Sequence, residues 1–149
     1  MKIGQYRIMD SESFSIRKFP TDDDGGLAKN GEADRALAKN IEELVRLQDM
    51  LFAHNRYGVL LILQAMDAAG KDGAIKHVMS GLNPQGVQVK AFKAPSAEEL
   101  DHDYLWRGQP HLPARGNIAI FNRSYYEDVI VVKVHQLLEE QNMPDQLIK

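Results

Sequence analysis

Residues 64–73 decide the fold of this chain, and they read Gln64-Ala65-Met66-Asp67-Ala68-Ala69-Gly70-Lys71-Asp72-Gly73. An unbroken apolar run, 59–63, precedes them, and a helix-compatible stretch, 74–79, follows them. Such a run is typical of a buried parallel strand, and a Gly-rich turn into a helix leaves main-chain amides pointing into a concave nest. This order predicts a phosphate site over 68–73, with Lys71 reaching across it as a point charge. An ordinary tight turn between strand and helix is the alternative.

The loop departs from the Walker A pattern of P-loop proteins at two positions. Ala65 stands where the first Gly belongs, and Asp72 stands where a Ser or Thr hydroxyl would hold Mg²⁺. A loop without that hydroxyl needs another metal ligand, and Asp67 offers a hard carboxylate oxygen. We therefore interpret Asp67 as a metal ligand, with a loop-capping Asp as the alternative.

Composition bounds the class of protein. The chain has 149 residues and no cysteine, which predicts one domain without disulfides, Cys-zinc sites or thiol catalysis. It contains no apolar run of about 18 residues and no apolar leader, so we expect a cytoplasmic protein that does not enter a membrane. A formal charge of −3 argues against a general nucleic-acid binder.

Three strands are predicted, over 59–63, 87–92 and 117–121. The second alternates and is rich in branched residues, and the third is apolar and leads directly into Asn122. An apolar strand ending in Asp is how P-loop proteins hold Mg²⁺ opposite the lysine. Because Asn122 stands at that position here, we expect a weaker or water-mediated metal contact.

Helical spacing of apolar residues predicts a helix over 34–54 with Asp34 as its N-cap. Ser96 followed by Glu99 is a capping box, and we expect that helix to extend through Arg107. Residues 125–138 favour a strand by propensity and a helix by connectivity, and we choose the helix. Residues 1–33 are predicted to be an irregular N-terminal segment, and 34–149 an α/β domain.

Three segments together resemble the type 2 polyphosphate kinases, in the branch that phosphorylates AMP and ADP. They are 64–73, Phe92-Lys93-Ala94-Pro95, and Phe121-Asn122-Arg123-Ser124-Tyr125-Tyr126-Glu127-Asp128-Val129. The resemblance implies an α/β P-loop kinase fold, a parallel sheet with flanking helices. It also implies Mg²⁺-dependent phosphoryl transfer between inorganic polyphosphate and adenine nucleotides.

Carried over by position, the resemblance implies a role for each matching residue. Asp67 would bind metal and orient the accepting phosphate, and Lys71 would hold the transferred group. Arg123 would contact phosphate, and Asn122 stands where many relatives have the second-strand Asp. For the basic track that a long polyanion requires, we single out Lys76, with Lys93 and Arg107 as weaker candidates.

Members of that family continue beyond this chain's end, with a lid and further strands. We therefore expect a sheet of order 2-3-1 whose first strand lies at an edge, with the C-terminal strands and lid missing. The chain alone is expected to bind phosphate weakly, to transfer it poorly and to form a homo-oligomer through its uncovered apolar surfaces.

Three other functions remain open at this point. They are an ATP-dependent nucleoside monophosphate kinase, a phosphate-binding subunit without catalysis, and a structural role with an empty loop. The preferred nucleotide, the direction of transfer and the stoichiometry are not decided by the sequence.

Overall fold

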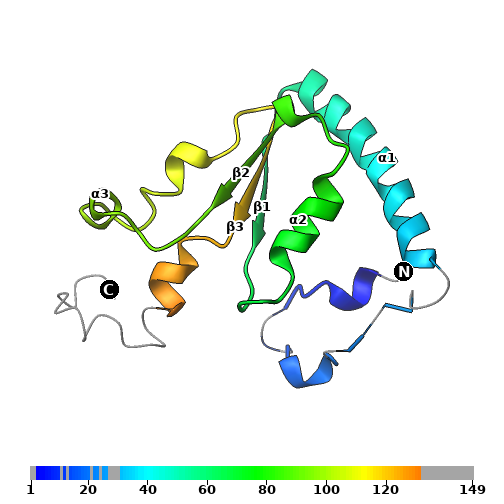
Figure 1. The fold of residues 1–149 in the computed structure, drawn as a ribbon, viewed down its shortest axis with the longest axis horizontal. Helices are drawn as coiled ribbons and strands as arrows, with labels where there is room; N and C mark the ends of the chain where they lie inside the picture. The colour runs from blue at the N-terminus through cyan, green and yellow to red at the C-terminus, as the bar shows by residue number, and fades with distance from the viewer. Residues whose placement is uncertain are drawn as a thin grey trace. The chain divides into compact units, whose positions relative to one another are not determined.

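Three parallel strands form the centre of the fold (Figure 1). They are β1 (Val59–Leu63), β2 (Val87–Ala91) and β3 (Ile118–Asn122), arranged in the order β1-β3-β2. This confirms the predicted order, with strand bounds within one residue of expectation. The last residues of the strands, Leu63, Asn122 and Ala91, lie opposite one another, so all three carboxyl ends meet at one edge of the sheet. The computed structural model describes residues 3–10, 12, 14–20, 22–23, 25–26 and 31–131.

The core is centred on β3, because this strand has a neighbour on both sides. Residues 118–121 are all buried, and Phe92 packs its ring edge-on against Phe121 with 4.9 Å between ring centres. In contrast, β1 has a neighbour on one side only. Val59, Leu60, Leu61 and Ile62 are 36–44% exposed, so the expectation of a buried strand is wrong for β1 in this chain.

The helix α1 (Glu32–His54) begins two residues before Asp34, which therefore lies in its first turn and is not its N-cap. It ends where Asn55 adopts a positive φ of 48°, a conformation common just after a helix. Near its middle, Gln48 is buried and exchanges two hydrogen bonds of 2.9 Å with the main chain of Asn83. No local pattern in the sequence predicts this polar contact.

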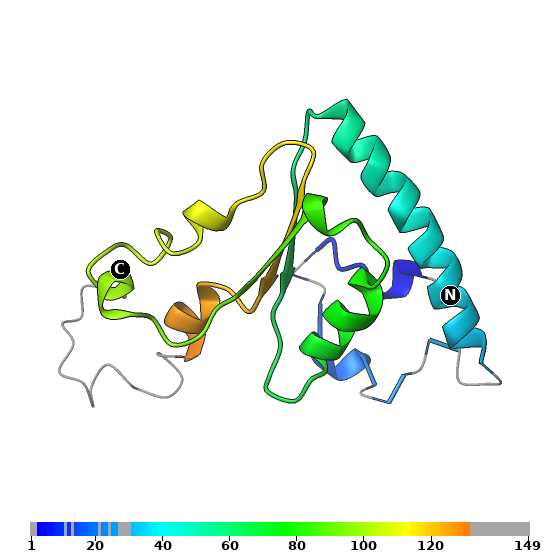
Figure 2. The ribbon, with the colours of Figure 1, turned by 45° about the horizontal axis from the view of Figure 1, so that its top comes forward.

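After the loop, α2 (Lys71–Met79) lies alongside the sheet in both ribbon views (Figures 1 and 2). A short helical turn, η3 (Pro84–Gly86), then leads into β2. The predicted capping box is present at α3 (Ala97–Leu100): Ser96 accepts from the Glu99 amide, and Glu99 accepts from the Ser96 amide.

However, α3 ends at Leu100, so the predicted extension through Arg107 is wrong. The carboxylate of Asp103 accepts a hydrogen bond of 2.9 Å from the Leu105 amide, and this local bond competes with the helix. A series of turns follows, leading to η4 (Gln109–His111). The side chain of Trp106 stacks on His102 with 4.1 Å between ring centres and is half-buried.

Beyond β3, the π-helical turn η5 (Glu127–Val131) agrees with the helix chosen for 125–138. The remainder of that prediction, residues 132–138, lies outside the described residues. The chain divides into two compact units, Met1–Asn40 and Ile41–Lys149. The first contains η1 (Ile3–Tyr6), η2 (Ile16–Lys18) and a hydrogen bond of 2.7 Å from Tyr6 to Asp23. None of the helices in the described residues combines the length and the apolar character needed to cross a bilayer.

Candidate functional site

All the predicted site residues except Lys76 and Arg107 line one cavity of about 580 Å³ at the carboxyl edge of the sheet. Its walls are the loop residues 67–73, residues 91–94 after β2, and Asn122 with Arg123 at the end of β3. Thus Asp67, Lys71, Lys93, Asn122 and Arg123 are brought together from three separate segments. This is the edge where open α/β sheets place their ligands.

The loop turns sharply between β1 and α2, at the predicted position. Ala68 and Gly70 both have positive φ values, 61° and 87°, and Gly70 is the N-cap residue of α2. The amide of Ala69 bonds to the Met66 carbonyl at 3.3 Å, so this amide is occupied by the protein. The amides of residues 71–73, which form the first turn of α2, have no acceptor among the described residues. They can therefore donate to an anion.

Lys71 lies differently from the expectation. Its ammonium is folded back over its own loop and donates to the carbonyls of Ala65 and Met66, both at 2.8 Å. It still lines the cavity, and an ammonium has a third N–H to donate. The side chain therefore stabilises its own loop with two hydrogen bonds and keeps one N–H that can donate into the cavity.

The two expected metal ligands each have a protein partner. The carboxylate of Asp67 is 83% exposed and forms an ion pair with Arg123, and the side-chain amide of Asn122 donates to Asp72. Among the described residues no group of three or more His, Asp or Glu side chains gathers at metal-binding distance. Nevertheless, Asp67, Asp72 and Asn122 line the same cavity and offer hard oxygen donors.

The basic track is only partly assembled. Lys93 lines the cavity, whereas Lys76 is exposed on α2 and lies outside its lining. Arg107 is only 4% exposed and pairs with Asp128 and Glu99, so its assignment to an exposed track is wrong. Its guanidinium is committed to the protein itself.

Sequence reasoning missed three residues that bond to one another next to the cavity lining: Gln64, Ser124 and Glu127. Gln64 donates to Glu127 at 2.7 Å, and Glu127 in turn accepts from Arg123 at 3.4 Å. The buried hydroxyl of Ser124 donates to Gln64 at 3.2 Å. The spacing of Arg123 and Glu127, four residues apart, is a signal for an ion pair along a helix. The contact of Gln64 across 63 positions has no local signal.

Comparisons with known proteins agree with this geometry. The family model described as Polyphosphate kinase 2 (PPK2) matches residues 27–148. The chain is 49% identical over 97% of its length to an ADP-polyphosphate phosphotransferase of Rhodopseudomonas palustris, covering 50% of that protein. It is 44% identical over 92% of its length to an AMP/ADP-polyphosphate phosphotransferase of Meiothermus ruber, covering 52% of that protein.

The fold is shared with a solved structure at clear sequence identity. The crystal structure of Polyphosphate Kinase 2 from Arthrobacter aurescens TC1 aligns with a TM-score of 0.80 at 39% identity, over 90% of this chain and 49% of that one. The chain thus spans about half the length of these relatives. The match of the family model over residues 27–148 and the identity to these relatives show that the chain belongs to the polyphosphate kinase 2 family.

Proposed function

We propose that the protein transfers phosphoryl groups between inorganic polyphosphate and AMP or ADP. The observation that carries this proposal is the single cavity that gathers an open amide nest, two lysines and an arginine in a member of this family. The printed names of two relatives, ADP-polyphosphate and AMP/ADP-polyphosphate phosphotransferase, support the substrate class. Phosphoryl transfer depends on positioning and charge neutralisation, which such groups supply without a covalent nucleophile.

In this proposal the chain's own residues divide the work. The amides of 71–73 hold phosphate oxygens at the N-terminus of α2, where the helix dipole also favours an anion. Lys71 holds the transferred group with its remaining N–H. Arg123 contacts phosphate once it leaves Asp67, and Lys93 faces the same anion from the wall after β2. Lys76, outside the cavity, contacts only a chain of phosphates long enough to reach it.

We further propose that Mg²⁺ is the metal and that Asp67 holds it, with Asn122 and Asp72 beside it. Two carboxylates and an amide oxygen fit a small hard cation that takes its remaining ligands from water and phosphate. When bound, the ion would supply charge neutralisation at the phosphoryl group. Asp67 would exchange Arg123 for the ion, and this exchange leaves Arg123 free for phosphate.

For the 149-residue chain alone we propose weak phosphate binding and poor transfer. A second candidate, a phosphate-binding subunit without catalysis, is favoured by one observation: Asp67 and Arg123, both needed for transfer, engage each other. A cytoplasmic location and self-association complete the proposal.

The test compares phosphate donors with the purified chain and Mg²⁺. Long-chain polyphosphate with AMP or ADP is run beside ATP with AMP, and nucleotide products are quantified. Slow product formation with polyphosphate as the donor, and none with ATP, supports the proposal. Fast formation with polyphosphate overturns the expectation that the chain transfers phosphate poorly. Formation only with ATP indicates a nucleoside monophosphate kinase.

Variants of two lysines on the same helix sharpen the test. Lys71→Met keeps the aliphatic stem and removes the charge, and we expect at least a tenfold loss of tripolyphosphate affinity in calorimetry, since charged hydrogen bonds contribute about 1.5–3 kcal/mol. Lys76→Met, outside the cavity, should leave tripolyphosphate affinity within about twofold and weaken only long-chain polyphosphate. Binding by wild type without turnover supports the second candidate. If polyphosphate neither binds nor raises the melting temperature, the phosphate site itself is wrong.

A further inference from the structure

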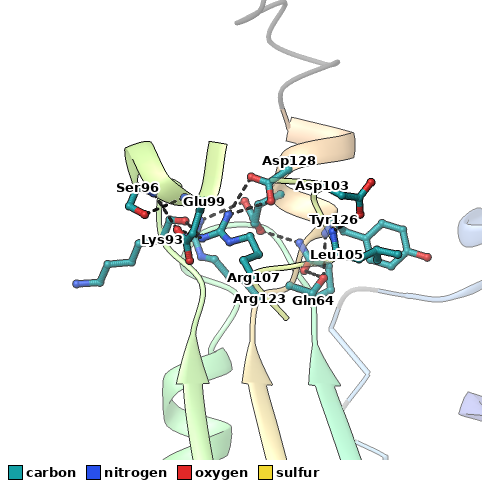
Figure 3. A network of polar contacts seen from close by, with 12 residues as sticks. Gln64, Lys93, Ser96, Glu99, Asp103, Leu105, Arg107, Arg123, Tyr126 and Asp128 are labelled. Atoms are coloured by element: carbon teal, nitrogen blue, oxygen red, sulfur yellow. Dashed lines mark hydrogen bonds and ion pairs between the residues drawn. The ribbon is translucent and has the colours of Figure 1, made fainter. Parts of the chain in front are cut away.

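A buried guanidinium lies beside the cavity without lining it. Arg107, in the turns after α3, is 4% exposed, and its contacts reach the end of β2, the start of α3 and the turn η5 (Figure 3). The first two segments precede Arg107 by 14 residues or fewer, whereas Asp128 in η5 follows it by 21 positions. The side chain therefore joins elements that the sheet alone does not connect at this edge.

Its contacts use the planar fork of the arginine. Nη1 donates to both carboxylate oxygens of Asp128, at 3.0 and 2.9 Å, and Nη2 donates to the carbonyl of Lys93 at 2.7 Å. Nη2 also lies 3.5 Å from the carboxylate of Glu99, which is held by the capping box. The guanidinium carbon is 5.2 Å from the ring centre of Phe92. Nε is buried and has no partner within the described residues.

Two of these contacts lead to the cavity wall. Phe92 and Lys93 line the cavity directly, so the bond to the Lys93 carbonyl holds the main chain of that wall. Asp128 follows Glu127, which accepts from the lining residue Arg123. Arg107 thus anchors the segments that carry two of the cavity's cations.

Stability is a poor explanation for this arrangement. A buried ion pair loses so much hydration that apolar side chains of similar volume are often as stabilising. The Asp128 side chain is 19% exposed, and this burial raises the pKa of its carboxyl although the hydrogen bonds from Arg107 oppose the rise. An ion pair that gains little stability is retained more readily if its geometry is needed.

We propose that Arg107 is a positioning residue of the phosphate cavity, fixing Lys93 through its main chain and the Arg123 segment through Asp128. This inference rests on the proposed function of the cavity. The fork is essential because one ammonium cannot hold a bidentate carboxylate and a carbonyl in the same plane. A lysine at this position keeps the charge and loses one of the two attachments.

The experiment compares Arg107→Lys with Gln48→Ala in the full chain. Gln48 is also buried and also ties down main chain, through Asn83, but at the amino end of β2, away from the cavity. It is therefore a control for loss of a buried polar tie. Arg107→Met, which fills the space with an apolar chain, serves if the lysine variant folds poorly.

Three quantities are measured on each variant: the denaturant midpoint, the tripolyphosphate affinity by calorimetry, and amide hydrogen exchange. The Phe92 amide, bonded to the Asn122 carbonyl at 3.0 Å, reports on the cavity wall, and the Asn83 amide reports on the control site. We expect Arg107→Lys to raise the tripolyphosphate dissociation constant about tenfold, that is about 1.4 kcal/mol, and to speed exchange at Phe92. Gln48→Ala should speed exchange at Asn83 and change the affinity less than twofold.

The possible outcomes separate the two proposals. An affinity within twofold of wild type in Arg107→Lys, or an equal loss in Gln48→Ala, overturns the positioning role. If wild type binds no tripolyphosphate, the proposed function of the cavity fails. Amide hydrogen exchange at Phe92 in Arg107→Lys then decides whether Arg107 orders the cavity wall. If that exchange is unchanged from wild type, the positioning role of Arg107 is overturned as well.

Discussion

Asp67 and Arg123 form an ion pair in the lining of the cavity. Both residues are assigned here to the ligands, one to the metal and one to phosphate, so their ion pair is a competitor of binding. An exposed pair of this kind is weak, because water and salt screen it. The pair is therefore expected to exchange readily for ligands.

Replacing Asp67 by Asn tests this competition, with opposite effects in two conditions. Without metal, tripolyphosphate should bind about two- to fivefold more tightly, because Arg123 is released and one negative charge is removed. Wild type should bind tripolyphosphate more tightly in Mg²⁺ than in EDTA, and Asp67→Asn should lose this difference. Calorimetry in EDTA and in Mg²⁺ measures both effects, and weaker binding by Asp67→Asn in EDTA would contradict the competition.

At the scale of the element, the entry to α2 depends on one left-handed residue. Gly70 has a φ of 87°, whereas Gly73 lies within the helix, and a Cβ added at either position meets no atom within 4 Å. Space is therefore equal at the two sites, and only backbone preference differs.

The two glycines predict stability changes of opposite sign. Gly70→Ala should lower the free energy of unfolding by about 1–2 kcal/mol, because an L-residue is strained at positive φ. Gly73→Ala should raise it by up to about 1 kcal/mol, because alanine loses less backbone entropy in a helix. Urea unfolding measures both, and the same sign for the two variants would refute the conformational explanation.

The capping box of α3 predicts a dependence on pH. The amide of Ser96, more than the nearby Arg107, holds the pKa of Glu99 below its ordinary value of 4.5. Because the folded-state pKa is lowered, the ionised carboxylate stabilises the fold above about pH 4.5, and this stabilisation is lost as the pH falls through the lowered pKa.

The corresponding variant is Glu99→Gln. We expect it to be less stable than wild type by about 1 kcal/mol at pH 7, with the difference closing below pH 4.5. Unfolding series at several pH values provide the measurement. Glu43→Gln, which removes an exposed partner of Arg46, is the control and should change stability much less. A difference that persists unchanged at pH 3 would exclude ionisation as its cause.

At the scale of the whole molecule, the two edges of the sheet differ in chemistry. The edge strand β2 alternates and carries Gln88 and Lys90, which discourage pairing with another sheet. The other edge, β1, is Val-Leu-Leu-Ile-Leu with four of its side chains exposed. An open, uncharged apolar edge is a site for association between chains.

We therefore predict concentration-dependent self-association through β1. Leu61→Lys should shift the chain towards the monomer in sedimentation velocity, because a charge at the edge cannot be buried between strands. Val89→Lys, at a side chain 49% exposed on β2, should leave the association unchanged. A wild-type chain that stays monomeric across the micromolar range would refute the prediction.

The sequence by itself determined the features that depend on neighbours along the chain. The apolar runs of the three strands, the spacing of α1, the Ser96–Glu99 capping box and the phosphate loop all follow from local periodicity and short-range hydrogen bonds. The family resemblance supplied the strand order, and the topology confirms it.

Only the tertiary structure decided the contacts between distant segments. Arg123 meets Asp67 across 56 positions, Gln64 meets Glu127 across 63, and Arg107 is buried against Asp128 although the sequence placed it on an exposed track. Such pairs form because the parallel strands end at a common edge of the sheet. The direction of each side chain at this edge depends on local turns, such as the turn in which the Leu105 amide donates to the Asp103 carboxylate. No periodicity encodes that geometry, so the composition of the cavity was predictable while its internal pairing was not.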